Sequence, residues 1–239
     1  MDTTKIEKGN VRMVAHRGLS GIERENTNAA FVAAGNRSYY GIETDVRKTA
    51  DGHFVLNHDG NLTRIAGEDV VVEEVSLRQL QAVLLTDTDG NRDRTDLRTP
   101  ELGNYIKICK RYEKQAVLEL KGLFTQEDVQ QIVDIIKSYD YLDRVTFISF
   151  CFDNLVFLKN ILPDQSAQFL ERELTDEVIA RAVAHKLDVD IKYTALTPEN
   201  IKAAHDAGLV VNCWTVDSPE TAEQLVQWGV DYITTNILE

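Results

Sequence analysis

The chain is most strongly constrained by an alternation between short β-branched runs and longer segments with helical periodicity. Candidate strands lie at residues 11–15, 41–47, 116–121, 145–150, 167–171, 188–193, 210–216 and 232–235. The clearest helical segments are residues 26–35, 100–112, 126–138, 153–161, 176–186, 198–207 and 219–228. Strands that alternate with helices imply parallel pairing through crossovers. We therefore predict an α/β fold in which the eight strands close into a (β/α)8 TIM barrel.

Several helix boundaries carry their own signals. Thr197 and Ser218 each precede a proline at the first helical position, which is typical of helix starts. We expect neither to complete a capping box with the residue three positions later. No helical segment follows the eighth strand, so we expect the last barrel helix to be missing or replaced by the N-terminal segment.

One connection is much longer than a single crossover. Residues 48–115 separate the second and third strands, and residues 53–57 within them look like a short extra strand. Residues 87–100 are polar and charged, which is typical of an exposed excursion near the barrel mouth. The apolar content of 43% and charged content of 27% are ordinary for a globular protein. We predict a single domain over residues 1–239 that includes 48–115 as an extended connection between the second and third barrel strands.

The charge balance limits the partners. A formal net charge of −13 disfavours nucleic acid and anionic lipid surfaces. No stretch approaches the ~20 apolar residues that span a bilayer, so we expect no stable membrane insertion. The three cysteines form no CxxC pair and are expected to be free thiols. Without a visible signal peptide we expect a cytoplasmic location, with a removed leader as the alternative.

Carboxylates gather at the predicted carboxyl ends of the strands, where TIM barrels place their active sites. Glu43 and Asp45 lie two positions apart on the second strand, so both can point into the barrel. Glu119 and Lys121 have the same spacing on the third strand. Three carboxylates at one mouth repel one another unless a cation compensates them. We therefore predict an oxygen-ligand site for one divalent cation, with calcium, magnesium and manganese as candidates.

Two histidines accompany this cluster. His16 ends the first strand, and His58 follows the extra strand of the long connection. A histidine near its ordinary pKa exchanges protons at neutral pH, so the pair can act as general acid and base. Arg17 and Lys121 can hold phosphate oxygens. Together these groups suit the cleavage of a phosphate ester.

Each residue also has an ordinary structural interpretation. A lone pair of carboxylates on a strand more often forms salt bridges, and a lone tryptophan such as Trp214 is most often core. We assign His53, His185 and His205 to surface or packing roles. Convergence of the candidate residues at the same predicted end of different strands favours the functional interpretation.

These residues lie in segments that resemble the glycerophosphodiester phosphodiesterase family. Residues 14–31 (VAHRGLSGIERENTNAAF) are similar to the family's opening HRG…ENT…AF block. Residues 41–64 (GIETDVRKTADGHFVLNHDGNLTR) are similar to its ExDV…HD block. The resemblance continues through 118–121 (LELK) and 210–236 (VVNCWTVDSPETAEQLVQWGVDYITTN). It spans nearly the whole chain after residue 10, and the ordered set is highly specific.

The resemblance implies a TIM-barrel enzyme that cleaves glycerophosphodiesters, such as glycerophosphocholine, to glycerol 3-phosphate and an alcohol. The resemblance implies that His16 and His58 are the acid–base pair and that Glu43, Asp45 and Glu119 bind the metal. It also implies that Arg17 and Lys121 contact the phosphate and that Trp214 lines the substrate site. Three positions depart from the family pattern: Arg24 replaces a proline, Ile65 follows Arg64, and Asn236 replaces an aspartate. None removes a proposed site residue, but such loops set substrate preference.

Several alternatives stay open at this point. One alternative function is that of a phosphodiesterase acting on lysophospholipid or other lipid head groups, which an exposed apolar patch at the mouth would favour. The other alternative is a binding protein that keeps the barrel fold but has no catalytic activity. The sequence leaves open which histidine is the base, whether a cyclic phosphate forms, and whether the chain is a homo-oligomer.

Overall fold

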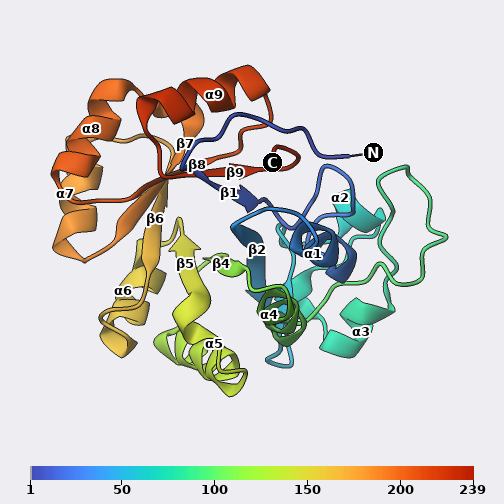
Figure 1. Ribbon diagram of the computed structural model, residues 1–239. Coiled ribbons are helices and arrows are strands. Elements are labelled where there is room, and N and C mark those ends of the chain that lie inside the picture. The colour runs from blue at the N-terminus through green and yellow to red at the C-terminus, as the bar shows by residue number, and fades with distance from the viewer. Residues whose placement is uncertain (1) are drawn as a thin grey trace.

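Parallel pairing runs around the whole barrel in the computed structural model, which describes residues 2–239 (Figure 1). Strand β1 (Arg12–Ala15) pairs with both β2 (Gly41–Lys48) and β9 (Tyr232–Thr235), and this double pairing closes the sheet. The ring is completed by β4 (Gln115–Leu120), β5 (Val145–Ser149), β6 (Ala167–Glu171), β7 (Asp188–Lys192) and β8 (Val211–Trp214). The predicted fold class, a TIM barrel, is confirmed.

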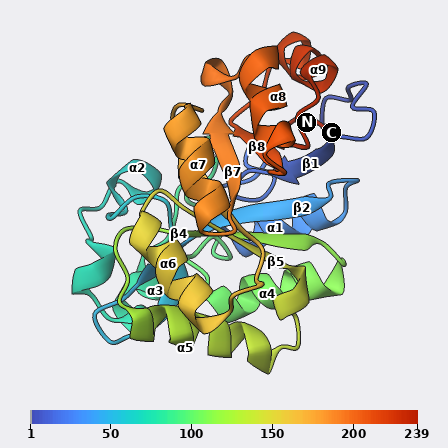
Figure 2. The ribbon, with the colours of Figure 1, turned by 90° about the vertical axis from the view of Figure 1, so that its left-hand side faces the viewer.

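Helices cover the outside of the ring, as Figure 2 shows for α6 and α7. The barrel helices are α1 (Asn28–Gly35), α4 (Leu102–Arg111), α5 (Gln126–Ser138), α6 (Phe152–Ile161), α7 (Asp176–Ala184), α8 (Pro198–Asp206) and α9 (Pro219–Trp228). The expectation that Thr197 lacks a capping box is wrong. The Asn200 side chain accepts from the Thr197 backbone N–H while the Thr197 hydroxyl accepts from the Asn200 N–H. A short amide can therefore fill the position usually taken by Glu or Gln.

The long connection between β2 and β4 forms a small annex on one side of the barrel (Figure 1). It contains β3 (Phe54–Leu56), α2 (Thr63–Ala66), a 3-10 turn at Val72–Glu74 and α3 (Leu77–Ala82). Its own apolar cluster consists of Val55, Leu62, Ile65, Ala66, Val72, Leu80, Leu85 and Leu97. Because β3 runs antiparallel to β2, it returns the chain toward the level of Asp45. The annex thereby delivers residue 58 to the barrel mouth.

The N-terminal segment lies beside the end of the chain, where a regular barrel would have another helix. Thr4 forms a parallel bridge with Leu238, and its carbonyl accepts from the Glu239 N–H at 2.8 Å. Lys5 Nζ lies 2.8 Å from the Glu239 carboxylate. Of the two arrangements expected for this position, the structure has an extended N-terminal segment there. Within residues 2–239, no helix combines the length and the apolar composition that crossing a bilayer requires.

The barrel interior is plugged by Val14, Val117, Ile148 and Leu170, which form a buried apolar cluster. The larger apolar core lies between the strands and the outer helices. Two members of this cluster, Ile148 and Leu170, also line the cavity at the barrel mouth.

The loop after β1 depends on Gly18. Its φ of +77° favours glycine, and a Cβ there would lie 2.7 Å from the backbone carbon of Ala30. We predict that Gly18→Ala lowers the free energy of unfolding by roughly 3 kcal/mol, through left-handed strain and the clash with α1. Urea denaturation measures this change.

Gly208 provides a matched control, because its φ of +82° is similar and a Cβ there would have no other atom within 4 Å. Gly208→Ala should cost only about 1 kcal/mol. Equal losses in the two variants would mean that packing of the β1–α1 loop on α1 contributes nothing.

Candidate active site

Three carboxylates meet at the mouth. One oxygen from each of Glu43, Asp45 and Glu119 lies within 4.8 Å of the others, and all three residues are buried. Glu43 and Asp45 share one face of β2, while Asp45 and Glu119 are direct neighbours in the β2–β4 register. The sequence-predicted set is therefore brought together at one rim of the barrel.

Two cations neutralise part of this charge. Lys121 Nζ lies 2.8 Å from Glu119 Oε1 and 3.1 Å from Asp45 Oδ1. Arg17 Nε lies 3.4 Å from Asp45 Oδ2, and the Arg17 backbone N–H donates to Glu43 Oε2 at 2.8 Å. A left-handed backbone at Arg17, with φ of 55°, accompanies that contact. Lys121 and Arg17, expected at this site, both lie against the carboxylates.

The crowding changes the titration of the carboxylates. Burial, together with Asp45 and Glu119, raises the pKa of Glu43 well above its usual value. Burial and Asp45 raise the pKa of Glu119 to about 7. Burial acts against ionisation of Asp45 too, but Lys121 and Arg17 outweigh it and hold the pKa of Asp45 below its usual value. The cluster therefore holds less negative charge in the folded chain than three free carboxylates would.

The donor set fits a hard divalent cation. All three groups offer oxygen, which calcium and magnesium prefer. The buried Asp45 Oδ1 has no hydrogen-bond partner among residues 2–239, although Lys121 lies close by. An ion at this point would satisfy that oxygen and remove the repulsion that raises the pKa values of Glu43 and Glu119.

His16 is held by a neutral amide. Its Nδ1 lies 2.7 Å from Asn236 Oδ1, which also accepts from the Ser20 hydroxyl. Asn236 Nδ2 donates to Asp217 Oδ2 at 2.6 Å, so the amide orientation is determined by the carboxylate behind it. Burial, with a further contribution from Arg17, lowers the pKa of His16 to about 4.

His58 is held by a carboxylate instead. Its Nδ1 lies 2.7 Å from Asp59 Oδ1, and Arg64 Nε donates to Asp59 Oδ2 at 2.7 Å. Arg64 also donates to both oxygens of Glu25, whose Oε1 accepts from Arg17 at 2.8 Å. Burial lowers the pKa of His58, although nearby Asp45 opposes that effect. One chain of ion pairs thus connects the two histidine loops.

A cavity of about 100 Å³ lies between the two histidines and the carboxylate cluster. Its lining comprises His16, Arg17, Glu43, His58, Glu119, Lys121, Ile148, Phe150, Leu170, Asp190, Trp214, Thr215 and Thr234. A second, more open hollow of about 480 Å³ adjoins it and shares His16 and Arg17. Ser20, Glu25, Asp217 and Asn236 also line this outer hollow. The two spaces therefore meet at the first histidine.

Aromatic and apolar side chains form part of the rim. Trp214 lines the cavity and packs edge-on against Phe150, with ring centroids 5.5 Å apart. Phe150 is 41% exposed, and Leu123, which follows β4, is 71% exposed. Exposed apolar side chains therefore follow the carboxyl ends of both β4 and β5.

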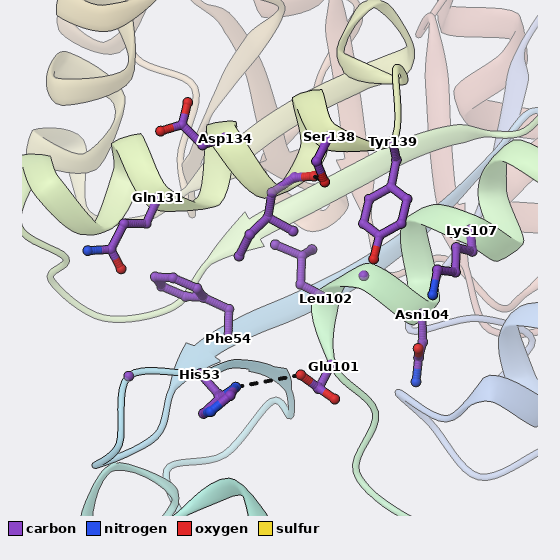
Figure 3. Close-up of a pocket in the computed structure, with 13 residues that line it drawn as sticks. His53, Phe54, Glu101, Leu102, Asn104, Lys107, Gln131, Asp134, Ser138 and Tyr139 are labelled. Carbon is purple, nitrogen blue, oxygen red and sulfur yellow. Dashed lines mark hydrogen bonds and ion pairs between the residues drawn. The ribbon is translucent and has the colours of Figure 1, made fainter.

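The other histidines lie away from the carboxylates. His53 borders a groove between α4 and α5, where its Nδ1 lies 3.6 Å from Glu101 Oε2 (Figure 3). His205 Nε2 lies 3.0 Å from Asp231, and the His185 ring packs edge-on against Phe152. The groove is about 520 Å³, larger than the mouth cavity, but its lining contains none of the expected site residues.

Sequence reasoning missed several groups that contact the site. Asn236 stands out in the sequence only as a departure from the family pattern, and Arg64 only by the residues that follow it. Glu25 and Asn26 lie inside the quoted ENT block, and Asn26 Nδ2 donates to Asp45 at 2.7 Å. Asp190 gives no sequence signal, because an aspartate in an alternating strand is an ordinary pattern.

The fold and the cavity define a TIM barrel with the layout of an enzyme, in which titratable groups converge at the carboxyl ends of the strands. The chain belongs to the glycerophosphoryl diester phosphodiesterase family, whose model matches residues 16–239. It is therefore an enzyme of the phosphoric diester hydrolase type.

The chain is similar to relatives and to solved structures over nearly its full length. A glycerophosphodiester phosphodiesterase from Caldanaerobacter subterraneus subsp. tengcongensis is 28% identical over 229 residues, covering 94% of this chain and 93% of the relative. A crystal structure of that type of enzyme from Thermotoga maritima has a TM-score of 0.77 at 25% identity, covering 95% of this chain and 94% of the other. An Oleispira antarctica phosphodiesterase in complex with the product sn-glycerol 3-phosphate has a TM-score of 0.89, with coverages of 98% and 96%; at 23% identity it supports the fold alone.

The raised pKa values make stability depend on pH. A carboxyl whose folded pKa lies above its unfolded value loses stabilisation as the pH rises through that interval, here from 4.5 to about 7 for Glu119. We predict that Glu43→Gln, measured in EDTA at pH 8, raises the free energy of unfolding by about 1 kcal/mol or more, because one of three close charges is removed. Thermal melts at pH 5 and pH 8 measure the effect.

Glu223→Gln on the exposed side of α9 is the matched control and should not change the difference between the two pH values. A Glu43→Gln variant less stable than the parent chain in EDTA at pH 8 would contradict mutual repulsion of the carboxylates.

Proposed function

We propose that the chain hydrolyses glycerophosphodiesters to glycerol 3-phosphate and an alcohol, using one divalent cation and the His16–His58 pair. The observation that carries this proposal is the cage of three buried carboxylates, two of which line the same cavity as both histidines. Membership of the family supports the substrate class. The three free thiols are consistent with the reducing cytoplasm.

Glu43, Asp45 and Glu119 would hold the cation, which is calcium, magnesium or manganese. When bound, it supplies positive charge that polarises the phosphoryl group and offsets the negative charge of the reaction. Arg17 and Lys121 lie against the same carboxylates, and their guanidinium and ammonium groups can turn to phosphate oxygens.

The partners of the two histidines support different roles. Asn236 Oδ1 can only accept, so it holds the proton of His16 on Nδ1 and leaves Nε2 as a basic nitrogen. The low pKa of His16 keeps the ring neutral. His58 faces the carboxylate of Asp59, which favours an imidazolium and opposes the lowering of the His58 pKa by burial. We assign His16 as the general base and His58 as the general acid.

In the proposed reaction, His16 Nε2 removes a proton from the nucleophile, which is water or the neighbouring glycerol hydroxyl. The phosphorus–oxygen bond to the alcohol breaks, and His58 donates its proton to that departing oxygen. With water, glycerol 3-phosphate forms directly; with the glycerol hydroxyl, a cyclic phosphate forms first and water then opens it. Both routes use the same two histidines.

A second candidate substrate is a lysophospholipid. The exposed side chains of Leu123 and Phe150 beside the mouth favour it, because an acyl chain could lie on that surface. A comparison of kcat/KM for glycerophosphocholine and lysophosphatidylcholine distinguishes the two substrates.

We predict that His16→Ala and His58→Ala each reduce kcat by roughly 10²–10⁴-fold, the usual contribution of general acid–base catalysis. The reason is that each removes the group that moves one of the two protons. Release of glycerol 3-phosphate from glycerophosphocholine measures the rate, and circular dichroism checks the fold.

His53→Ala is the control, because His53 lies in the groove between α4 and α5. It should retain the parental rate. Wild-type turnover in either site variant would refute the assigned pair, and an inactive parent chain would favour a silent binding barrel.

We also predict that EDTA abolishes turnover and that calcium, magnesium or manganese restores it. Because the cation relieves repulsion between ionised carboxylates, it should raise the melting temperature more at pH 8 than at pH 5. Asp45→Asn should lose most of this shift. A cation-induced shift that is equal in Asp45→Asn and the parent chain would place the ion elsewhere.

A further inference from the structure

Strand β7 carries a buried carboxyl that the proposed reaction does not use. Asp190 is 1% exposed, and its Oδ1 has no hydrogen-bond partner among residues 2–239. The residue nevertheless lines the mouth cavity together with Glu43 and Glu119. A buried polar atom without a partner costs about 1–3 kcal/mol, so its presence in the cavity wall calls for an explanation.

The ring order places Asp190 opposite the carboxylate cluster. Around the barrel the strands follow β1-β9-β8-β7-β6-β5-β4-β2, and β1 pairs with β2 to close the ring. From β2, four steps in either direction reach β7. Asp190 therefore lines the cavity from the strand diametrically opposite the one that carries Glu43.

The polar side chains next to Asp190 form their hydrogen bonds with groups other than its carboxyl. Asn212, its register partner on β8, donates to Gln168 and accepts from Thr234. The Trp214 indole N–H donates to the backbone carbonyl of Asp190, not to its carboxyl. Within the described chain, no lysine, arginine or histidine lies within ion-pair distance of this side chain. Burial, with a smaller effect of Glu119, raises the pKa of Asp190 well above its usual value.

The surroundings of Asp190 are mostly apolar. Ile148, Leu170, Phe150 and Trp214 line the same side of the cavity, on β5, β6 and β8 and just beyond β5. An apolar wall with one placed polar group is the usual way a small site binds a carbon skeleton that carries a hydroxyl. On the opposite side, the cations and histidines would hold the phosphate.

We propose that Asp190 hydrogen-bonds a hydroxyl of the substrate's glycerol and thereby selects diesters that carry this polyol. The inference rests on the proposed function and names one of its specificity determinants. A hydroxyl both donates and accepts, so it can pair with the carboxyl in either protonation state. The cavity of about 100 Å³ suits the three-carbon end, while the 480 Å³ outer hollow is left for the leaving alcohol.

The test compares sn-glycerol 3-phosphate with ethyl phosphate, which lacks both hydroxyls, by isothermal titration calorimetry with the activating cation present. The parent chain should bind sn-glycerol 3-phosphate more tightly than ethyl phosphate. Asp190→Leu should reduce that preference at least tenfold, because a site built around a hydroxyl loses its selectivity with the pairing group. Asp190→Asn, which still pairs with a hydroxyl, should stay within about threefold of the parent preference.

Thermal unfolding separates this role from a structural one. Asp190→Leu should melt at the parental temperature or above it, since an unpartnered buried carboxyl is replaced by an apolar group of the same branching beside a cavity. Equal weakening of both ligands, an unchanged preference, or a parent chain that does not prefer sn-glycerol 3-phosphate would overturn the inference. Hydrolysis of glycerophosphocholine by the same parent preparation reports on the proposed function independently.

Discussion

The arrangement of side chains at the barrel mouth is governed by the repulsion between three neighbouring carboxylates. Asp45 and Glu119 are neighbours in the β2–β4 register on one sheet face, where like charges destabilise pairing. Glu43 adds a third carboxylate two residues before Asp45. The fold tolerates the arrangement because Lys121 lies between Asp45 and Glu119, while Arg17 contacts Asp45 and Glu43. The compensation is incomplete, as the raised pKa values of Glu43 and Glu119 indicate, and an added cation would complete it.

The annex between β2 and β4 connects this charge balance to the second histidine. β3 brings His58 back to the rim, where Arg47 donates to its backbone carbonyl. Beyond His58, the chain Asp59–Arg64–Glu25–Arg17 returns to the carboxylate cluster. Arg17 directly follows His16, and through Glu25 and Arg64 it is connected to Asp59, the hydrogen-bond partner of His58. The annex has its own apolar core, so this network rests on a packed support.

The periodic parts of the molecule could be predicted from the sequence, because alternating strands and helices leave local patterns. β6 and β9 lie at the expected residues, and the other strands differ by one or two residues at their ends. The short helices α2 and α3 leave no such period. Asn236 meets His16 across 220 positions of sequence, and only closure of the barrel brings them together. Asp190 likewise becomes noteworthy only when the ring order sets it opposite Asp45.

Closure of the barrel places chemically different groups on opposite sides of the cavity. The carboxylates lie on β2 and β4, and Lys121 and Arg17 lie just beyond β4 and β1. The opposite strands present an apolar wall with one buried carboxyl. His16 has a neutral partner and His58 an acidic one, so their proton affinities differ even though both rings are partly or fully buried. In the proposed reaction, these partners assign proton uptake to His16 and proton release to His58. Since the outer hollow opens beside His16, a diester bound in this barrel meets chemically different surroundings at its two ends.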